Sequence, residues 1–185
     1  MNSNFFKSCW LSFLTYINKK YLEARKIFTL LKKNFKVVAP VSGRVIDLKS
    51  INDKVFSEKL AGEGVAIEPT GDVIAAPADG MISLVFKTGH AFSMLLSNGI
   101  ELLVHIGLDT VELEGKGFEI LVKEKRFVKC GEPIIKVDRE GILAKGYTLT
   151  TPVIITNPDK VFELKCNLGD NVELGKDTIF TYKTK

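Results

Sequence analysis

Short apolar runs separated by closely spaced turn residues make up the chain from Lys36 to Lys185, and this pattern most constrains its fold. The 185 residues include six prolines and fifteen glycines, which interrupt the apolar runs too often for long helices. The pattern predicts an all-β fold, an antiparallel β-sandwich or barrel-like single domain over residues 36–185. Between Asp138 and Tyr147 the strand pattern breaks, and we expect a short helical turn there.

Two short motifs occur twice in this region. An Ala-Pro-x-x-Gly turn at residues 39–43 returns at residues 76–80, and the segment 128–135 is paralleled by 172–179. Repeated strand–turn segments favour a sandwich or barrel. They also fit a swinging-arm biotinyl or lipoyl module, but the chain lacks an evident modification lysine between paired methionines. No linker rich in Pro, Gly or Ser divides residues 37–185.

Residues 1–35 have a different pattern, that of a basic amphipathic helix. Apolar residues recur at steps of three and four, at Phe6, Trp10, Phe13, Ile17, Tyr21, Ala24, Phe28 and Leu31. The longest uncharged stretch, Ser8 to Asn18, has eleven residues, too few to span a bilayer. No A-x-A cleavage site follows, which argues against a secretory signal. The stripe either binds a membrane surface or packs on the β-domain.

Charge and cysteine content narrow the functional classes. Residues 1–36 hold eight Lys/Arg and one Asp/Glu, whereas residues 37–185 hold 18 Lys/Arg and 21 Asp/Glu. The slightly acidic body argues against nucleic acid as a partner. Cys9, Cys130 and Cys166 form no C-x-x-C motif, so neither a disulfide framework nor a zinc knuckle is expected. We therefore expect a cytoplasmic protein, peripheral at the inner face of the membrane if residues 1–35 bind lipid.

The chain has only two histidines, His90 and His105, and a predicted hairpin brings them together. Asn98-Gly99 is a strong signal for a two-residue hairpin loop. With that loop, Phe92 faces His105, and the two histidines are diagonal neighbours with Cβ atoms about 7 Å apart. One face of the predicted hairpin is core, with Ile100, Leu102, Val104, Ile106, Ala91 and Leu95. The other face carries both histidines with Phe92, Met94, Leu103 and Glu101.

Two neighbouring imidazoles suit phosphoryl transfer. A neutral imidazole can attack a phosphoryl group, and a second imidazole can stabilise the oxygens in the transition state. A zinc site would need a third protein ligand. Asp53 or Asp109 could supply one, but neither H-E-x-x-H nor H-x-H occurs. We therefore predict no cofactor and no metal centre, although His90 and His105 could serve as weak zinc ligands. A metal-dependent hydrolase on a related β-scaffold is the alternative function.

Other catalytic signatures are missing from the sequence. It contains no G-x-S-x-G elbow of a serine hydrolase. It also contains no GxxxxGK[ST] phosphate loop, so a nucleotide is not expected as the phosphoryl donor.

The sequence around both histidines resembles the glucose-type enzyme IIA family of the bacterial phosphoenolpyruvate-dependent sugar phosphotransferase system. Residues 99–111 resemble the family's signature, and residues 88–93 resemble the segment that carries its second histidine. The similarity continues through residues 112–118 and 150–153 and covers roughly residues 37–185. It implies a β-sandwich with phosphohistidine at His105.

The resemblance also implies roles for further residues. His90 would stabilise the transferred phosphoryl group, with Thr88 hydrogen-bonded to one of the imidazoles. Asp53 and Asp109 match acidic residues that meet arginines of partner proteins. Phe56 and Phe86 match apolar residues of the docking patch, whereas Leu103 departs from a phenylalanine common there.

These implications define a phosphoryl carrier. It would accept phosphate from the histidine phosphocarrier protein and pass it to a cysteine of an enzyme IIB domain, for sugar uptake and phosphorylation. Because transfer needs contact between two active sites, we expect an exposed apolar patch around the histidines. Its expected members are Phe56, Phe86, Phe92 and Leu103, with Asp53 and Asp109 at the rim.

Overall fold

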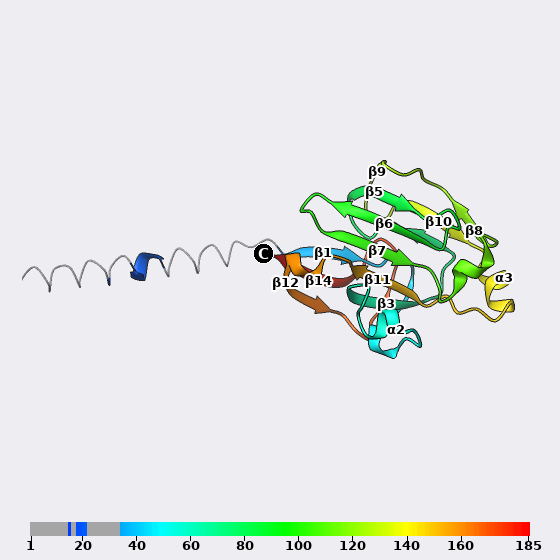
Figure 1. The fold of residues 1–185 in the computed structure, drawn as a ribbon, viewed down its shortest axis with the longest axis horizontal. Coiled ribbons are helices and arrows are strands. Elements are labelled where there is room, and N and C mark those ends of the chain that lie inside the picture. Colours follow the sequence, from blue (N-terminus) through cyan, green and yellow to red (C-terminus); the bar gives the residue numbers. More distant parts are fainter. Residues whose placement is uncertain (1–14, 16–17, 22–33) are drawn as a thin grey trace, which may run out of the picture. The chain divides into compact units, whose positions relative to one another are not determined.

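The computed structural model describes Thr15, residues 18–21 and residues 34–185 (Figure 1). The chain divides into two compact units, residues 1–33 and residues 34–185. In the first unit, Thr15 and residues 18–21 are helical, and the rest of the predicted amphipathic stripe lies outside the described residues. Within the described part of the chain, no helix is long and apolar enough to cross a membrane.

The second unit is built from antiparallel strands, as the alternating apolar pattern predicts. All its strand pairs are antiparallel. The strands are β1 (Phe35–Val38), β2 (Gly43–Ile46), β3 (Glu63–Pro69), β4 (Val73–Ala75), β5 (Gly80–Val85), β6 (Ala91–Leu96), β7 (Glu101–His105), β8 (Phe118–Ile120), β9 (Phe127–Val128), β10 (Pro133–Val137), β11 (Thr151–Ile155), β12 (Val161–Cys166), β13 (Asn171–Val172) and β14 (Thr178–Thr184). The prediction of an all-β, sandwich-like domain is confirmed.

Only short helices interrupt the strands. They are η1 (Leu48–Ser50), α2 (Lys54–Ser57), η2 (Thr110–Leu113), α3 (Arg139–Ala144) and η3 (Pro158–Lys160). Helix α3 is the helical turn expected after Asp138, which caps it by accepting a hydrogen bond from the Gly141 backbone N–H.

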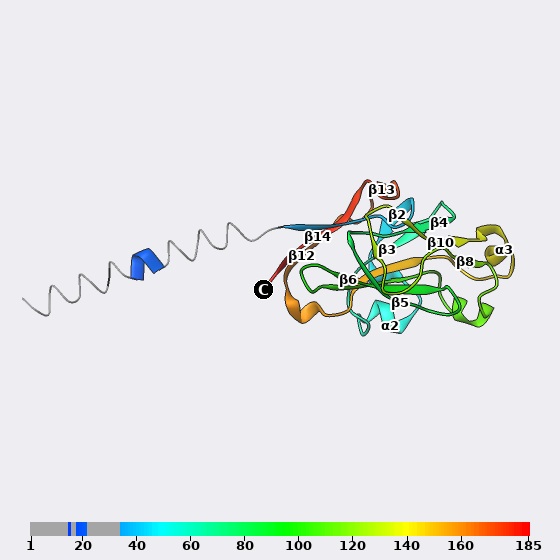
Figure 2. The same ribbon diagram turned by 90° about the horizontal axis from the view of Figure 1, so that it is seen from above.

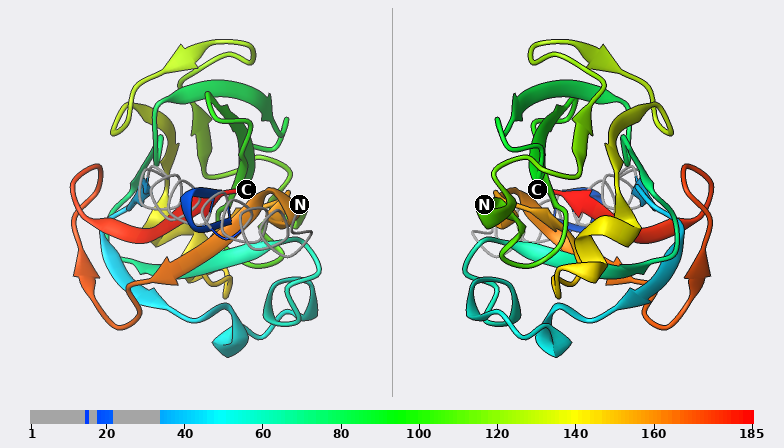
Figure 3. Two further views of the ribbon diagram at one scale, coloured as in Figure 1. Left: turned by 90° about the vertical axis from the view of Figure 1, so that its left-hand side faces the viewer. Right: turned by 90° about the vertical axis from the view of Figure 1, so that its right-hand side faces the viewer.

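An eight-stranded sheet and two three-stranded sheets enclose the main core. The large sheet has the order β13-β2-β3-β11-β7-β6-β5-β9, and the smaller ones are β1-β14-β12 and β4-β10-β8. Figures 2 and 3 show the strands of this unit curving around its interior. Strand β11 lies in the middle of the large sheet and is buried along its whole length. Its Val153 and Ile155 join the main core, and Ile154 points to a second cluster on the opposite face.

The repeated sequence motifs form a matching pair in space. Each Ala-Pro turn accepts a hydrogen bond from the residue that precedes the other turn. The Val38 N–H donates to the Pro77 carbonyl (2.9 Å), and the Ala75 N–H donates to the Pro40 carbonyl (2.7 Å). The two later repeats meet at Gly131 and Gly175, where a Cβ on Gly175 would lie 3.0 Å from the Gly131 Cα. Each copy of a repeated motif therefore packs against its own counterpart.

A second, smaller apolar cluster covers the outer face of the large sheet. It contains Leu48, Ile51, Phe56, Ala66 and Ile154. The segment that carries η1 and α2 supplies three of these residues. Asp53 begins α2, and its carboxylate accepts a hydrogen bond from the Val55 N–H at 2.7 Å. This cap fixes the short helix, and the buried Phe56 ring of that helix packs against His105 at the end of β7.

Candidate functional site

The hairpin that carries His105 has a three-residue loop, Ser97-Asn98-Gly99. The Gly99 N–H donates to the Leu96 carbonyl, and the Leu96 N–H donates to the Ile100 carbonyl, both at 2.9 Å. Gly99 has a φ of 79°, as in a type I turn followed by a left-handed residue. The predicted two-residue loop is therefore wrong, and every pair shifts by one residue: Ala91 lies opposite His105.

This shift reverses the faces of β6. Phe92 and Met94 are fully buried in the main core, whereas Leu95 is exposed. The prediction that Phe92 belongs to an exposed patch is wrong, because a one-residue change of register moves each side chain to the other face. The faces predicted for β7 are present: Leu102 and Val104 are buried, and Leu103 and His105 are partly exposed.

The two imidazoles nevertheless lie side by side. Their ring centroids are 5.1 Å apart with an interplanar angle of 72°. His90 comes before β6, in the bend that contains Gly89 (φ 67°), so it does not follow the alternation of the strand. Its carbonyl accepts a hydrogen bond from the Ile106 N–H at 2.7 Å, which holds this bend beside the end of β7.

His105 has one nitrogen engaged with the backbone. Its Nδ1 lies 2.8 Å from the Gly107 carbonyl oxygen. A carbonyl can only accept, so Nδ1 carries the proton and, in the neutral ring, Nε2 keeps a free lone pair. The Phe56 ring packs against this imidazole with a centroid distance of 5.2 Å. The arrangement presents Nε2 as the nucleophilic atom.

His90 is held by Thr88 and Phe86. The Thr88 Oγ1 lies 2.5 Å from the His90 Nδ1, and the Phe86 ring lies 5.1 Å from the imidazole centroid. Thr88 thus bonds one of the two imidazoles, as the family resemblance implied. His90 is only 6% exposed, so its remaining nitrogen can act in a shielded environment.

Burial keeps both rings neutral near neutral pH. Burial is the main cause that lowers the pKa of His90, and the charge of His105 lowers it further. Burial also lowers the pKa of His105, against the opposing effects of the Gly107 hydrogen bond and of the Asp53 and Asp109 charges. A lowered pKa preserves the lone pair that a nucleophile needs.

Asp53 and Asp109 lie on two segments that flank His105. Asp53 is partly exposed at the start of α2, and Asp109 is exposed at the start of η2 with a φ of 56°. Both raise the pKa of His105 through their charge. Their carboxylates therefore lie close enough to act on the imidazole and on a cationic partner.

The apolar residues near the histidines differ in exposure. Phe86 is 37% exposed and Leu103 is partly exposed, as expected of patch members. Phe56 is only 5% exposed, so the prediction that it belongs to the exposed patch is wrong: its ring packs against His105 and within the smaller apolar cluster. Sequence reasoning missed Val55 and Val111, which are about half exposed and follow Asp53 and Asp109 in the chain. The sequence held one signal for them: each lies two residues after a predicted site residue. It also missed two exposed leucines: Leu95, whose face depends on the register of β6, and Leu84, which follows an irregularity in β5.

The metal-ligand set at this site is limited to the imidazoles. Among the described residues, no group of three or more His, Cys, Asp or Glu side chains could hold a metal ion. Two imidazoles are fewer protein ligands than a catalytic zinc site uses.

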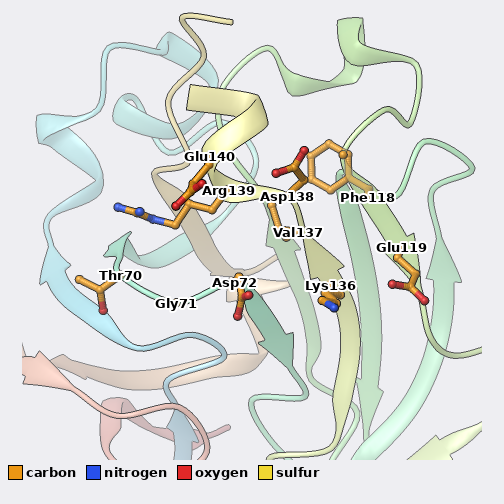
Figure 4. Close-up of a pocket in the computed structure, with 11 residues that line it drawn as sticks. Thr70, Gly71, Asp72, Phe118, Glu119, Lys136, Val137, Asp138, Arg139 and Glu140 are labelled. Atoms are coloured by element: carbon orange, nitrogen blue, oxygen red, sulfur yellow. The ribbon is translucent and has the colours of Figure 1, made fainter. Parts of the chain in front are cut away.

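An open groove lies elsewhere in the unit. It measures about 650 Å³ and is lined by Thr70, Gly71, Asp72, residues 117–119 and residues 136–140. Figure 4 shows Lys136 and Arg139 among the carboxylates of Asp72, Asp138 and Glu140. The groove has no histidine, and its mixed charges favour no single ligand. One of its lining residues, Phe118, lies close to the bend before His90: a Cβ placed on Gly89 would lie 2.7 Å from the Phe118 Cβ.

The described unit is an antiparallel β-sandwich that presents a pair of imidazoles near its surface. The chain belongs to the family described as phosphoenolpyruvate-dependent sugar phosphotransferase system, EIIA 1, whose model matches residues 35–161. The resemblance seen in the sequence is therefore confirmed, and the chain is a component of a sugar phosphotransferase system.

Relatives with the same domain occur alone and within longer chains. The PTS system glucose-specific EIIA component of Buchnera aphidicola subsp. Baizongia pistaciae is 38% identical over 179 residues, 97% of this chain and 96% of the relative. The glucose-specific EIICBA component of Staphylococcus carnosus is 48% identical over 121 residues, 65% of this chain. The chain spans only 18% of that relative's length. The name of that relative places its EIIA component in one chain with EIIB and EIIC components.

A solved structure has the same fold. The glucose permease IIA from Mycoplasma capricolum superposes with a TM-score of 0.76 and 37% identity, over 80% of this chain and 96% of that chain.

Proposed function

We propose that the protein is a phosphoryl carrier that accepts phosphate on Nε2 of His105. One observation carries this proposal: Nδ1 of His105 is bound to the Gly107 carbonyl, so that Nε2 is free beside a second imidazole. Family membership supplies the reaction class. The phosphoryl group would come from the histidine phosphocarrier protein and pass to a cysteine of an enzyme IIB domain.

Each transfer exchanges one bond to phosphorus for another. In the first step, Nε2 of His105 attacks the phosphorus, and the bond to the phosphocarrier's histidine nitrogen breaks. In the second step, a cysteine thiolate of enzyme IIB attacks, and the bond between phosphorus and Nε2 breaks. Nδ1 of His105 keeps its proton in both steps, because its N–H donates a hydrogen bond to the Gly107 carbonyl throughout.

His90 is the proposed stabiliser of the transferred group. When Thr88 donates to Nδ1 of His90, Nε2 carries the ring proton and can donate to a phosphoryl oxygen. The 5.1 Å separation of the rings suits a phosphoryl group held by both. His90 then acts on the transition state and need not form a covalent bond itself.

The surface around the histidines suits docking of a second protein. Phe86, Leu103, Val55 and Val111 supply exposed or partly exposed apolar area, and Asp53 and Asp109 supply negative charge. Exposed apolar patches of this kind mark interaction sites. We therefore assign the phosphocarrier and enzyme IIB to this one face.

The direct test is phosphorylation in a defined mixture. The full chain would be incubated with phosphoenolpyruvate, enzyme I and the histidine phosphocarrier, and its intact mass would be measured. We expect the mass of one phosphoryl group to be added, in acid-labile and base-stable form, and none to be added to His105→Ala. Undiminished labelling of His105→Ala would remove the assignment, and Cys130→Ser serves as a control that leaves the histidines in place.

Membrane association of residues 1–35 is a separate proposal from the sequence. The basic amphipathic pattern favours anionic bilayers at about 1 kcal/mol for each Lys or Arg near the surface. A carrier that serves a membrane transporter would work on the cytoplasmic side. Co-sedimentation with anionic vesicles, with and without residues 1–35, tests this proposal, and equal sedimentation of the two chains would contradict it.

A further inference from the structure

Thr110 lies beside the site but has no part in the transfer steps described above. It is the first residue of η2, and its side chain is fully buried. Its Oγ1 donates a hydrogen bond to the Ile106 carbonyl at 2.5 Å. This bond closes the loop from Ile106 to Thr110, which contains the Gly107 carbonyl that binds His105.

The loop fixes both peptide groups around Gly107. The peptide before Gly107 is held by the Thr110 hydroxyl through the Ile106 carbonyl. The peptide after Gly107 is held at its N–H end, because Leu108 N–H donates to the Thr148 carbonyl at 3.2 Å. Its remaining group is the Gly107 carbonyl, which faces Nδ1 of His105. With both planes fixed, the direction of this carbonyl is fixed.

The Thr110 methyl group restrains the same glycine. Gly107 has a φ of 78°, and a Cβ placed on it would lie 2.4 Å from the Thr110 Cγ2. The Thr110 side chain therefore touches the loop at two points, through its methyl at Gly107 and through its hydroxyl at Ile106. These two contacts can be removed separately. Thr110→Val removes the hydroxyl and keeps a methyl group, and Thr110→Ser removes the methyl group and keeps the hydroxyl.

We propose that Thr110 is a positioning residue for phosphoryl transfer: its buried hydroxyl aims the Gly107 carbonyl at Nδ1 of His105 and so selects Nε2 as the nucleophile. The effect of Thr110 on phosphoryl transfer rests on the proposed function, whereas its effect on the tautomer of His105 does not. Hydrogen-bond partners behind a reactive imidazole set its tautomer and orientation. The closest alternative, that Thr110 only stabilises the fold, predicts a loss of stability with an unchanged tautomer.

The first measurement needs no phosphorylation. Nitrogen-15 NMR of the full unphosphorylated chain at a pH where His105 is neutral reports which ring nitrogen carries the proton. We expect the Nδ1–H tautomer in the wild type and in Thr110→Ser, and a mixture of both tautomers in Thr110→Val. An Nε2–H tautomer in the wild type would overturn the proposal, and so would an unchanged Nδ1–H tautomer in Thr110→Val.

The second measurement is the rate of phosphoryl acceptance. Loss of a hydrogen-bond partner that orients a metal-ligating imidazole costs about 10- to 100-fold, and we expect the same scale for a partner that orients a nucleophilic imidazole. We expect Thr110→Val to lower kcat by about that factor with little change in KM, and Thr110→Ser to recover most of the rate. If Thr110→Val fails to fold while Thr110→Ser folds, the hydroxyl is structural and the proposal fails. If wild-type His105 takes no phosphate, the proposed function fails, while the tautomer measurement still decides the role of Thr110.

Discussion

Nδ1 of His105 lies 2.8 Å from the carbonyl oxygen of Gly107, and this contact depends on a residue without a side chain. Gly107 has a φ of 78°, in the region that favours glycine. A Cβ there would lie 2.4 Å from the Thr110 Cγ2 and 2.5 Å from the Thr148 carbonyl oxygen. The nucleophile therefore owes its orientation to a tight backbone loop.

Gly107→Ala should destabilise the protein by about 2–4 kcal/mol, because left-handed strain and overpacking add together. Gly146→Ala is the matched control. Gly146 also has a positive φ, 86°, but a Cβ added to it would meet nothing within 4 Å, so only the strain of about 1–2 kcal/mol remains. Urea unfolding measures both variants. Equal losses of unfolding free energy would show that the close contacts around Gly107 cost nothing.

His90 and His105 should respond differently to substitution. His90→Gln should still accept phosphate, because Nε2 of His105 remains the nucleophile. Onward transfer to enzyme IIB should slow by about 10²- to 10³-fold, the usual cost of one lost donor to the transition state. Rapid-quench transfer assays with His90→Gln and His105→Gln separate the two roles. A His90→Gln variant with wild-type onward transfer would exclude a stabilising role for His90.

Phe92 and Leu103 lie on opposite faces of the β6–β7 hairpin, which predicts opposite effects of truncation. Phe92 is fully buried in the main core, so Phe92→Ala should cost about 3–5 kcal/mol of unfolding free energy. Leu103 is partly exposed on the histidine face, so Leu103→Ala should cost less stability and should raise KM for the phosphocarrier. If Phe92→Ala left stability unchanged and weakened docking, the three-residue loop and its register would be wrong.

The register of this hairpin also marks the limit of what could be predicted from the sequence. Alternation and turn residues were sufficient for the all-β fold. Local similarity was sufficient to group Thr88, His90 and His105, which the structure brings together, while their roles stay a prediction. Asn98-Gly99 is compatible with either loop length. Asn98 donates to the Tyr182 hydroxyl at 2.9 Å, and this contact across 84 residues of sequence could not be read locally.

The histidines were predicted to lie close together, and they do, but the strand register used for that prediction was wrong. His90 reaches the face of His105 because the bend at Gly89 takes it out of the alternation of β6. The close approach of Phe118, which leaves no room for a Cβ on Gly89, could not be read from the local sequence. The exposed Leu95 was missed because the face of a strand residue cannot be assigned before the register is known. The exposed Leu84 was missed because it follows an irregularity in β5.

The lowered pKa values of His90 and His105 predict a stability that falls on acidification. Both groups have a folded-state pKa below the ordinary value of 6.5, so the unfolded chain binds more protons between the two values. Their contribution is fully present above the unfolded pKa and is lost as the pH falls through 6.5 towards the folded-state values. Urea unfolding between about pH 7.5 and about pH 5 should show this slope, and the double variant His90→Gln/His105→Gln should flatten it. A double variant with the wild-type slope would assign the pH dependence to other groups.

Asp53 and Asp109 should speed association with cationic partners through their charge. The double variant Asp53→Asn/Asp109→Asn removes two negative charges, and asparagine retains the helix cap at position 53. We expect the rate constant for transfer from the phosphocarrier to fall by about tenfold at low salt, with a weaker dependence on ionic strength, because steering by exposed charges is screened. Asp159→Asn/Asp170→Asn is the matched control, since it changes the net charge equally at two exposed residues, one in η3 and one just before β13. If the two double variants lose the same rate and salt dependence, net charge alone governs association, and the acids beside His105 have no special part in docking.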